Sequence, residues 1–144
     1  MIKMIHSYWA YIVLIVLIFA VVNAFIGLRA NKKFEAKDLR IALFALIASH
    51  IQLIFGFVAY YLSSFYDTMR AAGMGEVMKN SDLRKVLVEH PLVGIIAITL
   101  ITIGFSKHKK KTTDAAKFKT IAVFYTIALI LILSRIPWDL WFSN

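Results

Sequence analysis

Apolar residues fall into four long blocks separated by charged connectors, instead of alternating with polar residues along the chain. The blocks cover about 5–28, 41–62, 83–106 and 120–138. A helix rises ~1.5 Å per residue, so about twenty residues cross a ~30 Å hydrocarbon layer. The pattern therefore predicts four transmembrane helices. The first block is about twice as long as a secretion-signal core and no small-residue cleavage pattern follows it, so we expect an uncleaved span.

The third block is the least regular of the four. Its uncharged run, 90–106, is slightly short for a full crossing, so we expect the helix to begin near Asp82, with charged side chains at the membrane rim. Ser81 or Asp82 is its expected N-cap. Pro91 should bend this helix one residue after His90, unless it lies within the first helical turn.

Basic residues mark one side of the predicted membrane protein. Eleven of the seventeen Lys and Arg residues lie in the connectors 29–40 and 107–119, which follow the first and third spans. The positive-inside rule places both connectors in the cytoplasm, so both termini and the longest connector, 63–89, face outward. Four spans with short connectors predict an all-α fold. It is a single domain over 1–144, an antiparallel up-down-up-down four-helix transmembrane bundle.

The composition excludes several classes of protein. The net charge of +9 would suggest nucleic-acid binding in a soluble protein, but here the charges flank apolar spans. We therefore expect a lipid bilayer as partner and no nucleic acid. The chain has no cysteine, which excludes disulfides, iron–sulfur clusters, thiolate metal sites and covalently attached haem. Any haem would be held non-covalently.

Histidines inside the apolar blocks are the strongest functional signal. His50 lies near the middle of the second block, where an imidazole without partners costs on the order of several kcal/mol. His6 and His90 lie toward the outer ends of the first and third blocks. His108 stands in the run SKHKKK, and we expect it to be a solvated member of the basic connector. The candidate site therefore consists of the three intramembrane histidines.

Each of these histidines shares a helix face with small residues. Such residues let neighbouring helix backbones approach closely, which is the simpler interpretation of the pattern. They also open a slot in which a flat macrocycle fits beside an imidazole. The faces comprise Gly94, Ala97, Ile101 and Gly104 after His90, then Ala10, Val13, Leu17, Ala20, Ala24 and Gly27 after His6, and Ala45, Ala48, Ser49, Gln52, Gly56 and Ala59 around His50.

Depth in the membrane ranks the histidine pairs. Measured from the cytoplasmic helix ends, His50 lies ~15 Å up, His90 ~25 Å and His6 ~34 Å. We expect His50 and His90 to be the axial ligands of one haem iron, since both lie inside the apolar layer. His90 with His6 is the second choice, and His6 is otherwise a neighbouring hydrogen-bond donor.

Other polar residues have more ordinary roles available. Arg135, near the outer end of the fourth span, suits a haem propionate, although an arginine reaching to the membrane interface is the simpler interpretation. Asp38 is placed to cap the second helix. Asn23 and Gln52 are expected to form hydrogen bonds between helices.

Two alternatives to haem stay open. Glu89 and His90, with His6, could form a Zn²⁺ or Cu²⁺ site, but consecutive residues diverge by ~100° on a helix. The histidines could also be satisfied in hydrogen bonds within a non-redox subunit or scaffold. Motifs for hydrolysis and phosphoryl transfer are absent from the sequence, and no acidic pair in a span supports a proton-driven transporter.

Four segments carry a family resemblance: IHSYWAYIVLIV, LFALIASHIQLIFG, VEHPLVGIIAITLITIGFSK and KFKTIAVFYTIALILILSRIPW. Over nearly the whole chain, the sequence resembles small four-span proteins labelled cytochrome b in Bacteroidetes-type bacteria. The resemblance implies a haem-associated protein of the bacterial inner membrane, with His6, His50 and His90 at the histidine positions of the family. Familiar four-helix cytochrome b bundles hold two haems on two histidine pairs, whereas three intramembrane histidines favour one haem.

Together these observations predict a b-type haem protein of the bacterial inner (cytoplasmic) membrane. It would pass electrons between a quinol pool or partner subunit and an outer acceptor. We expect an electron-transfer subunit, within a homo-oligomer or larger membrane complex, rather than a stand-alone enzyme. The protein would hold the iron, exclude water and set its potential through ligand identity and burial.

Overall fold

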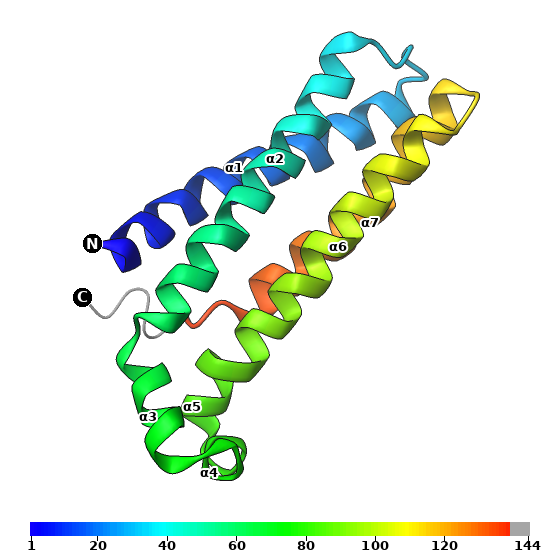
Figure 1. Ribbon diagram of the computed structural model, residues 1–144. Coiled ribbons are helices and arrows are strands. Elements are labelled where there is room, and N and C mark those ends of the chain that lie inside the picture. Colours follow the sequence, from blue (N-terminus) through cyan, green and yellow to red (C-terminus); the bar gives the residue numbers. More distant parts are fainter. Residues whose placement is uncertain (139–144) are drawn as a thin grey trace.

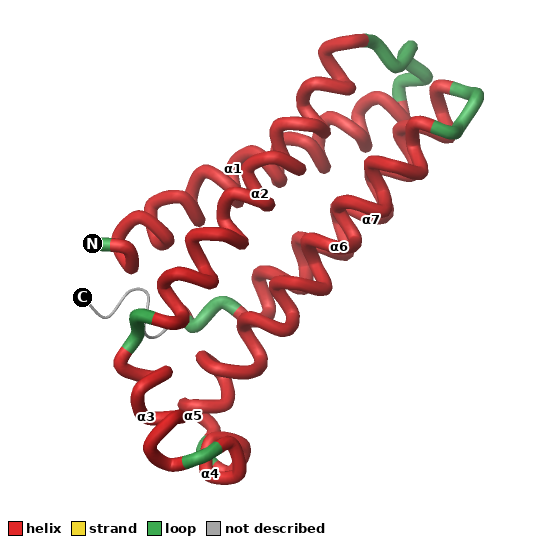
Figure 2. The backbone as a smooth tube through the Cα atoms, in the orientation of Figure 1, coloured by secondary structure: helices red, strands yellow, loops and turns green. Residues whose placement is uncertain are grey.

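The structure is a computed structural model that describes residues 1–138, and these residues form helices and connectors with no strand (Figures 1 and 2). The predicted all-α fold is therefore confirmed. The elements in chain order are α1 (Ile2–Arg29), α2 (Ala36–Tyr61), α3 (Ser64–Ala72), α4 (Met74–Lys79), α5 (Ser81–Arg84), the π-helix η1 (Lys85–Glu89), α6 (His90–Lys109) and α7 (Asp114–Arg135).

Four helical stretches are long and apolar enough to cross a membrane: Ile2–Arg29, Ala36–Tyr61, Ser81–Lys109 and Asp114–Arg135. The third combines α5, η1 and α6, and it begins next to the expected Asp82. The protein is therefore a multi-pass membrane protein. The fourth helix begins six residues before the predicted span because the Thr113 side chain accepts a hydrogen bond from the Ala116 amide. It ends at Arg135, since Ile136 precedes a proline and adopts an extended conformation.

The four long helices form a closed antiparallel bundle. Helix α1 packs against α2 and α7, and α6 packs against α7 and α2. Figure 1 shows both short connectors at one end, here called the basic end, and α3, α4 and α5 at the opposite end. The first and third spans therefore lead to the same end, as the sequence predicts.

The buried core lies toward the basic end of the bundle. Its members fall within 17–24 of α1, 42–45 of α2, 97–105 of α6 and 118–128 of α7. Many are alanines, and Gly104 lets Phe124 of α7 approach its backbone closely. The fully buried Tyr125 donates its hydroxyl to the Ala42 carbonyl at 2.8 Å. In this half of the molecule the small residues serve helix packing.

Two polar contacts fix the start of α2. The N-cap of α2 is Glu35 rather than Asp38, and one oxygen of the buried Asp38 carboxylate, inside the first turn, accepts the Glu35 amide at 2.9 Å in a capping box. The other accepts from the Asn23 side-chain amide, also at 2.9 Å, so Asn23 forms the expected hydrogen bond between α1 and α2. The carboxylate therefore satisfies donors on both helices.

The long connector differs from its prediction in one detail. It is largely helical, and the N-cap of α5 is Asn80 rather than Ser81 or Asp82. The Asn80 side-chain oxygen accepts from the amides of Asp82 and Leu83 at 3.0 and 3.2 Å. The Asn side chain reaches the second and third amides of the helix, which is the ordinary capping geometry.

Candidate histidine site

His6 and His90 meet near the end of the bundle opposite the basic connectors. Their ring centres are 6.3 Å apart and the ring planes are inclined by 73°. His6 belongs to the start of α1 and His90 opens α6, so the contact joins the first and third membrane spans. The structure thus brings together the second-choice pair of the sequence analysis.

The His90 ring is oriented by the last turn of α7. Its Nδ1 lies 3.0 Å from the Arg135 carbonyl oxygen. Because a carbonyl oxygen only accepts hydrogen bonds, Nδ1 carries the proton in the neutral ring and Nε2 keeps its lone pair. Histidines that ligate metals commonly have their second nitrogen held in this way.

The His6 ring lies against α2. A Cβ atom at Gly56 would stand 3.3 Å from the His6 Cε1 atom, a tight contact that a small shift of the ring would relieve, so the glycine favours this close approach of the ring to the helix. The Gln52 side-chain amide donates to the His6 carbonyl at 2.9 Å, which confirms the predicted role of Gln52 between helices. Two buried atoms here lack a hydrogen-bond partner among the described residues: His6 Nδ1 and Gln52 Oε1.

An irregular stretch of helix precedes His90. The π-helix Lys85–Glu89 continues directly into α6, in which Pro91 is the second residue. Pro91 has no amide hydrogen for the Leu87 carbonyl four residues earlier, and the Tyr60 hydroxyl donates to that oxygen at 2.9 Å. A π segment inside a helix often accompanies a functional site.

A small charged cluster borders the histidines. The Glu89 carboxylate receives the Arg84 Nε at 2.8 Å, and Arg135 Nε lies 4.0 Å from its other oxygen. Glu89 is thus engaged by arginine instead of joining His90 and His6 around an ion. Across residues 1–138, no group of three or more His, Cys, Asp or Glu residues has the arrangement of a metal site.

His50 does not join this pair. Its ring is exposed on α2, with Nδ1 2.8 Å from the Leu46 carbonyl and Nε2 3.4 Å from the Thr102 hydroxyl. Thr102 lies twelve residues after His90, which is about 18 Å along α6. One iron cannot bridge that separation, so the structure does not support the predicted pairing of His50 with His90. The depths inferred from the sequence, ~15 Å for His50 and ~25 Å for His90, assumed that the cytoplasmic ends of the two helices lie at one level, and they underestimated this separation.

His108 was expected to be solvated, and that prediction is wrong. The side chain is 1% exposed and its Nδ1 lies 2.5 Å from the Phe105 carbonyl. Its ring lies 5.2 Å from the Phe34 ring and 4.8 Å from the Phe105 ring, measured between centres. The connector residue Phe34 folds over the end of α6 and covers the imidazole, a tertiary contact that the run of lysines conceals.

The bundle is more open around the histidines than in its core. At Gly94, one turn after His90 on the same face, an added Cβ would have no atom within 4 Å. The buried core begins only at Ala97 on α6 and at Leu17 on α1. The small residues therefore have two roles, close packing in one half of the molecule and open space beside His90 in the other.

Comparison with models of protein families, with curated proteins and with solved structures finds no match to this chain. The resemblance to four-span proteins labelled cytochrome b therefore stays a prediction. The fold defines the class of protein, a four-span α-helical membrane protein. The histidine site is the feature from which a function is proposed.

Proposed function

We propose that this protein binds one b-type haem between His6 and His90 and serves in electron transfer. The separation of the two rings carries the proposal. A metal–nitrogen bond is about 2.0–2.1 Å long and an imidazole nitrogen lies roughly 1 Å from its ring centre, so opposed ligands have ring centres about 6 Å apart. The observed separation is 6.3 Å.

The surrounding residues fit this assignment. The Arg135 carbonyl holds the His90 Nδ1 proton and leaves Nε2 as a ligand. On the other side, His6 Nδ1 and Gln52 Oε1 both lack partners, although Gln52 already bonds to the His6 backbone. The Gln52 oxygen is an acceptor of the kind that the Nδ1 proton needs, and a proton on Nδ1 would leave the His6 Nε2 to hold the haem.

The open face of α6 provides the second argument. The absence of atoms within 4 Å of a Cβ at Gly94 leaves room for the edge of a macrocycle beside His90. The Arg135 guanidinium, at the end of the bundle and only loosely paired with Glu89, is placed for a propionate. Arg84 would hold Glu89 away from the two histidines.

Haem would supply reversible one-electron chemistry, and the chain would control its environment. The two imidazoles would fix the orientation of the cofactor. The apolar side chains of four spans would exclude water, and the arginines at the rim would favour the charged propionates. The electron partners would be a membrane quinol or a neighbouring subunit on one side and an acceptor near the outer surface on the other.

Optical spectra of purified variants test the proposal. We expect the wild-type protein to show a reduced-minus-oxidised b-type spectrum with one haem per chain. His6→Ala or His90→Ala should reduce haem content at least about tenfold, since each removes a residue that would hold the haem. His50→Ala is the matched control and should retain haem. Gly94→Leu should also lose haem while keeping its helical circular dichroism, because the side chain enters free space in the protein without cofactor.

The outcomes separate the alternatives. A well-folded, colourless protein that gains no spectrum on addition of haemin would contradict the proposal and favour a scaffold role. Haem loss in His50→Ala with retention in His6→Ala would overturn the assignment of ligands. Stoichiometric zinc or copper in elemental analysis, without haem, would identify a histidine metal site instead.

A further inference from the structure

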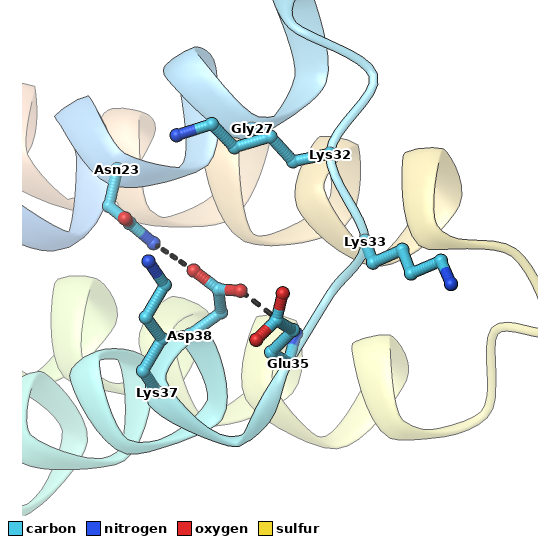
Figure 3. Close-up of a pocket in the computed structure, with 7 residues that line it drawn as sticks. All are labelled: Asn23, Gly27, Lys32, Lys33, Glu35, Lys37 and Asp38. Carbon is cyan, nitrogen blue, oxygen red and sulfur yellow. Dashed lines mark hydrogen bonds between the residues drawn. The ribbon is translucent and has the colours of Figure 1, made fainter.

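A cavity at the basic end of the molecule is not explained by the histidine site. It has a volume of about 280 Å³ and lies between the end of α1 and the start of α2. Figure 3 shows its lining residues, among them three lysines and the hydrogen-bonded pair Asn23 and Asp38. The full lining is Asn23, Gly27, Lys32, Lys33, Glu35, Lys37 and Asp38.

The local backbone explains how Lys32 reaches the cavity. Asn31 adopts a left-handed conformation with φ of 52°, and the Lys32 amide donates to the Gly27 carbonyl at 3.0 Å. This six-to-one bond is the C-terminal turn that commonly ends a helix. It reverses the chain, so the Lys32 side chain lies back over Gly27 in Figure 3.

Two ammonium groups point into the same region. In Figure 3, Lys32 extends along α1 toward Asn23, and Lys37 extends from α2 toward the same amide, while Lys33 points away. Within residues 1–138, Lys32 and Lys37 form no ion pair with a carboxylate closer than 4.0 Å. Both positive charges are therefore available to an anion.

The carboxylate below them is already engaged. Both Asp38 oxygens accept hydrogen bonds, one from Asn23 and one from the Glu35 amide. Asn23 keeps a second amide hydrogen beyond the one given to Asp38. The cavity thus presents two cations and a neutral donor, beside the exposed Glu35 and over a buried acid that holds the donor in place.

We propose that this cavity binds the phosphate group of an anionic phospholipid. It lies at the end of two membrane spans, beside the connector 29–40, where a headgroup phosphate would meet the lysines while its acyl chains follow the helices. Basic pockets between transmembrane helices bind acidic headgroups in this manner. Lys32 and Lys37 would contact the phosphate oxygens, and Asn23 would donate to one of them.

Native mass spectrometry of the intact chain tests this site. The protein is released from nanodiscs containing phosphatidylglycerol and phosphatidylcholine, and bound lipids are counted. We expect preferential retention of one phosphatidylglycerol, and about fivefold weaker retention for each lysine removed in Lys32→Gln and Lys37→Gln. The matched control for the double variant Lys32→Gln with Lys37→Gln is Lys110→Gln with Lys111→Gln, which removes the same two charges from the other basic connector and should leave retention unchanged.

Three results would overturn the proposal. Equal retention of the two lipids would show no headgroup site. Equal loss in the control variant would show general attraction to the basic end instead of a defined pocket. Binding of inorganic phosphate in discs of phosphatidylcholine alone, dependent on Lys32 and Lys37 and without phosphatidylglycerol preference, would identify a soluble phosphate as the ligand.

Discussion

Glycine positions on α6 show how differently two residues of one type are constrained. A Cβ at Gly104 would stand 2.5 Å from the Phe124 Cβ, an atom attached to the backbone of α7 that cannot move away alone. A Cβ at Gly94 would meet nothing within 4 Å. The first glycine is required by helix contact, and the second leaves open space.

We predict that Gly104→Ala destabilises the protein by about 1–3 kcal/mol, because α6 and α7 must separate to admit the methyl group. Gly94→Ala should change the free energy of unfolding by less than about 1 kcal/mol. Reversible unfolding in mixed detergent micelles measures both. Comparable destabilisation by the two substitutions would mean that the tight contact with Phe124 does not control stability.

At this scale the sequence predicted residue roles unevenly. Residue type singled out three intramembrane histidines, of which the structure brings His6 and His90 together, whereas depth ranked His50 with His90 first and these two lie far apart. Residue type also identified Asn23, Gln52 and Asp38 as hydrogen-bonding groups. It failed for His108, because its burial depends on Phe34 folding over it from another connector. A contact between segments that are far apart in the sequence leaves no pattern in the residues around either partner.

At the scale of the helix, the π-helix Lys85–Glu89 before His90 has a chemical cause. Pro91 withholds an amide hydrogen from the Leu87 carbonyl, and the Tyr60 hydroxyl replaces it from α2. A backbone carbonyl without a donor in a membrane costs several kcal/mol at most, and less where water reaches the end of the helix. The proline and the tyrosine should therefore be energetically coupled.

A double-mutant cycle measures that coupling. We predict that Tyr60→Phe destabilises the protein by about 1–2 kcal/mol, since the Leu87 carbonyl loses its donor. In a Pro91→Ala background the alanine amide can reach Leu87, so the same substitution should cost less than about half as much. Equal costs in both backgrounds would show that the hydroxyl does not compensate for the proline.

The helices themselves were predictable because lipid requires long apolar segments. The ends of the helices were less predictable, since caps such as Asn80 and Thr113 extend the helices into polar sequence. The π-helix Lys85–Glu89 had one available signal, the missing amide of Pro91. The partner that satisfies the freed carbonyl lies on another helix, so only the tertiary structure identifies Tyr60.

At the scale of the whole molecule, the small residues and the charged residues have different roles at the two ends of the bundle. The basic end contains the packed core and the lysine cavity, and the opposite end contains the histidine pair with its arginines. Tight packing of 17–24 of α1 and of 97–105 of α6 against 118–128 of α7 would hold the helices rigidly enough to fix the spacing of His6 and His90. The helices then do not close over the open space beside Gly94.

The difference in charge between the two ends predicts how the protein is oriented in the membrane. The two connectors at the basic end hold eleven of the seventeen Lys and Arg residues, and both are short enough for the positive-inside rule to apply. We predict that this end faces the cytoplasm and that the histidine pair lies near the outer surface. Alkaline phosphatase fused after Asn144 should be active, and green fluorescent protein fused there should be dark. Fusions after Lys111 should give the opposite result, and the reverse pattern would place the histidine site on the cytoplasmic side, away from any outer electron acceptor.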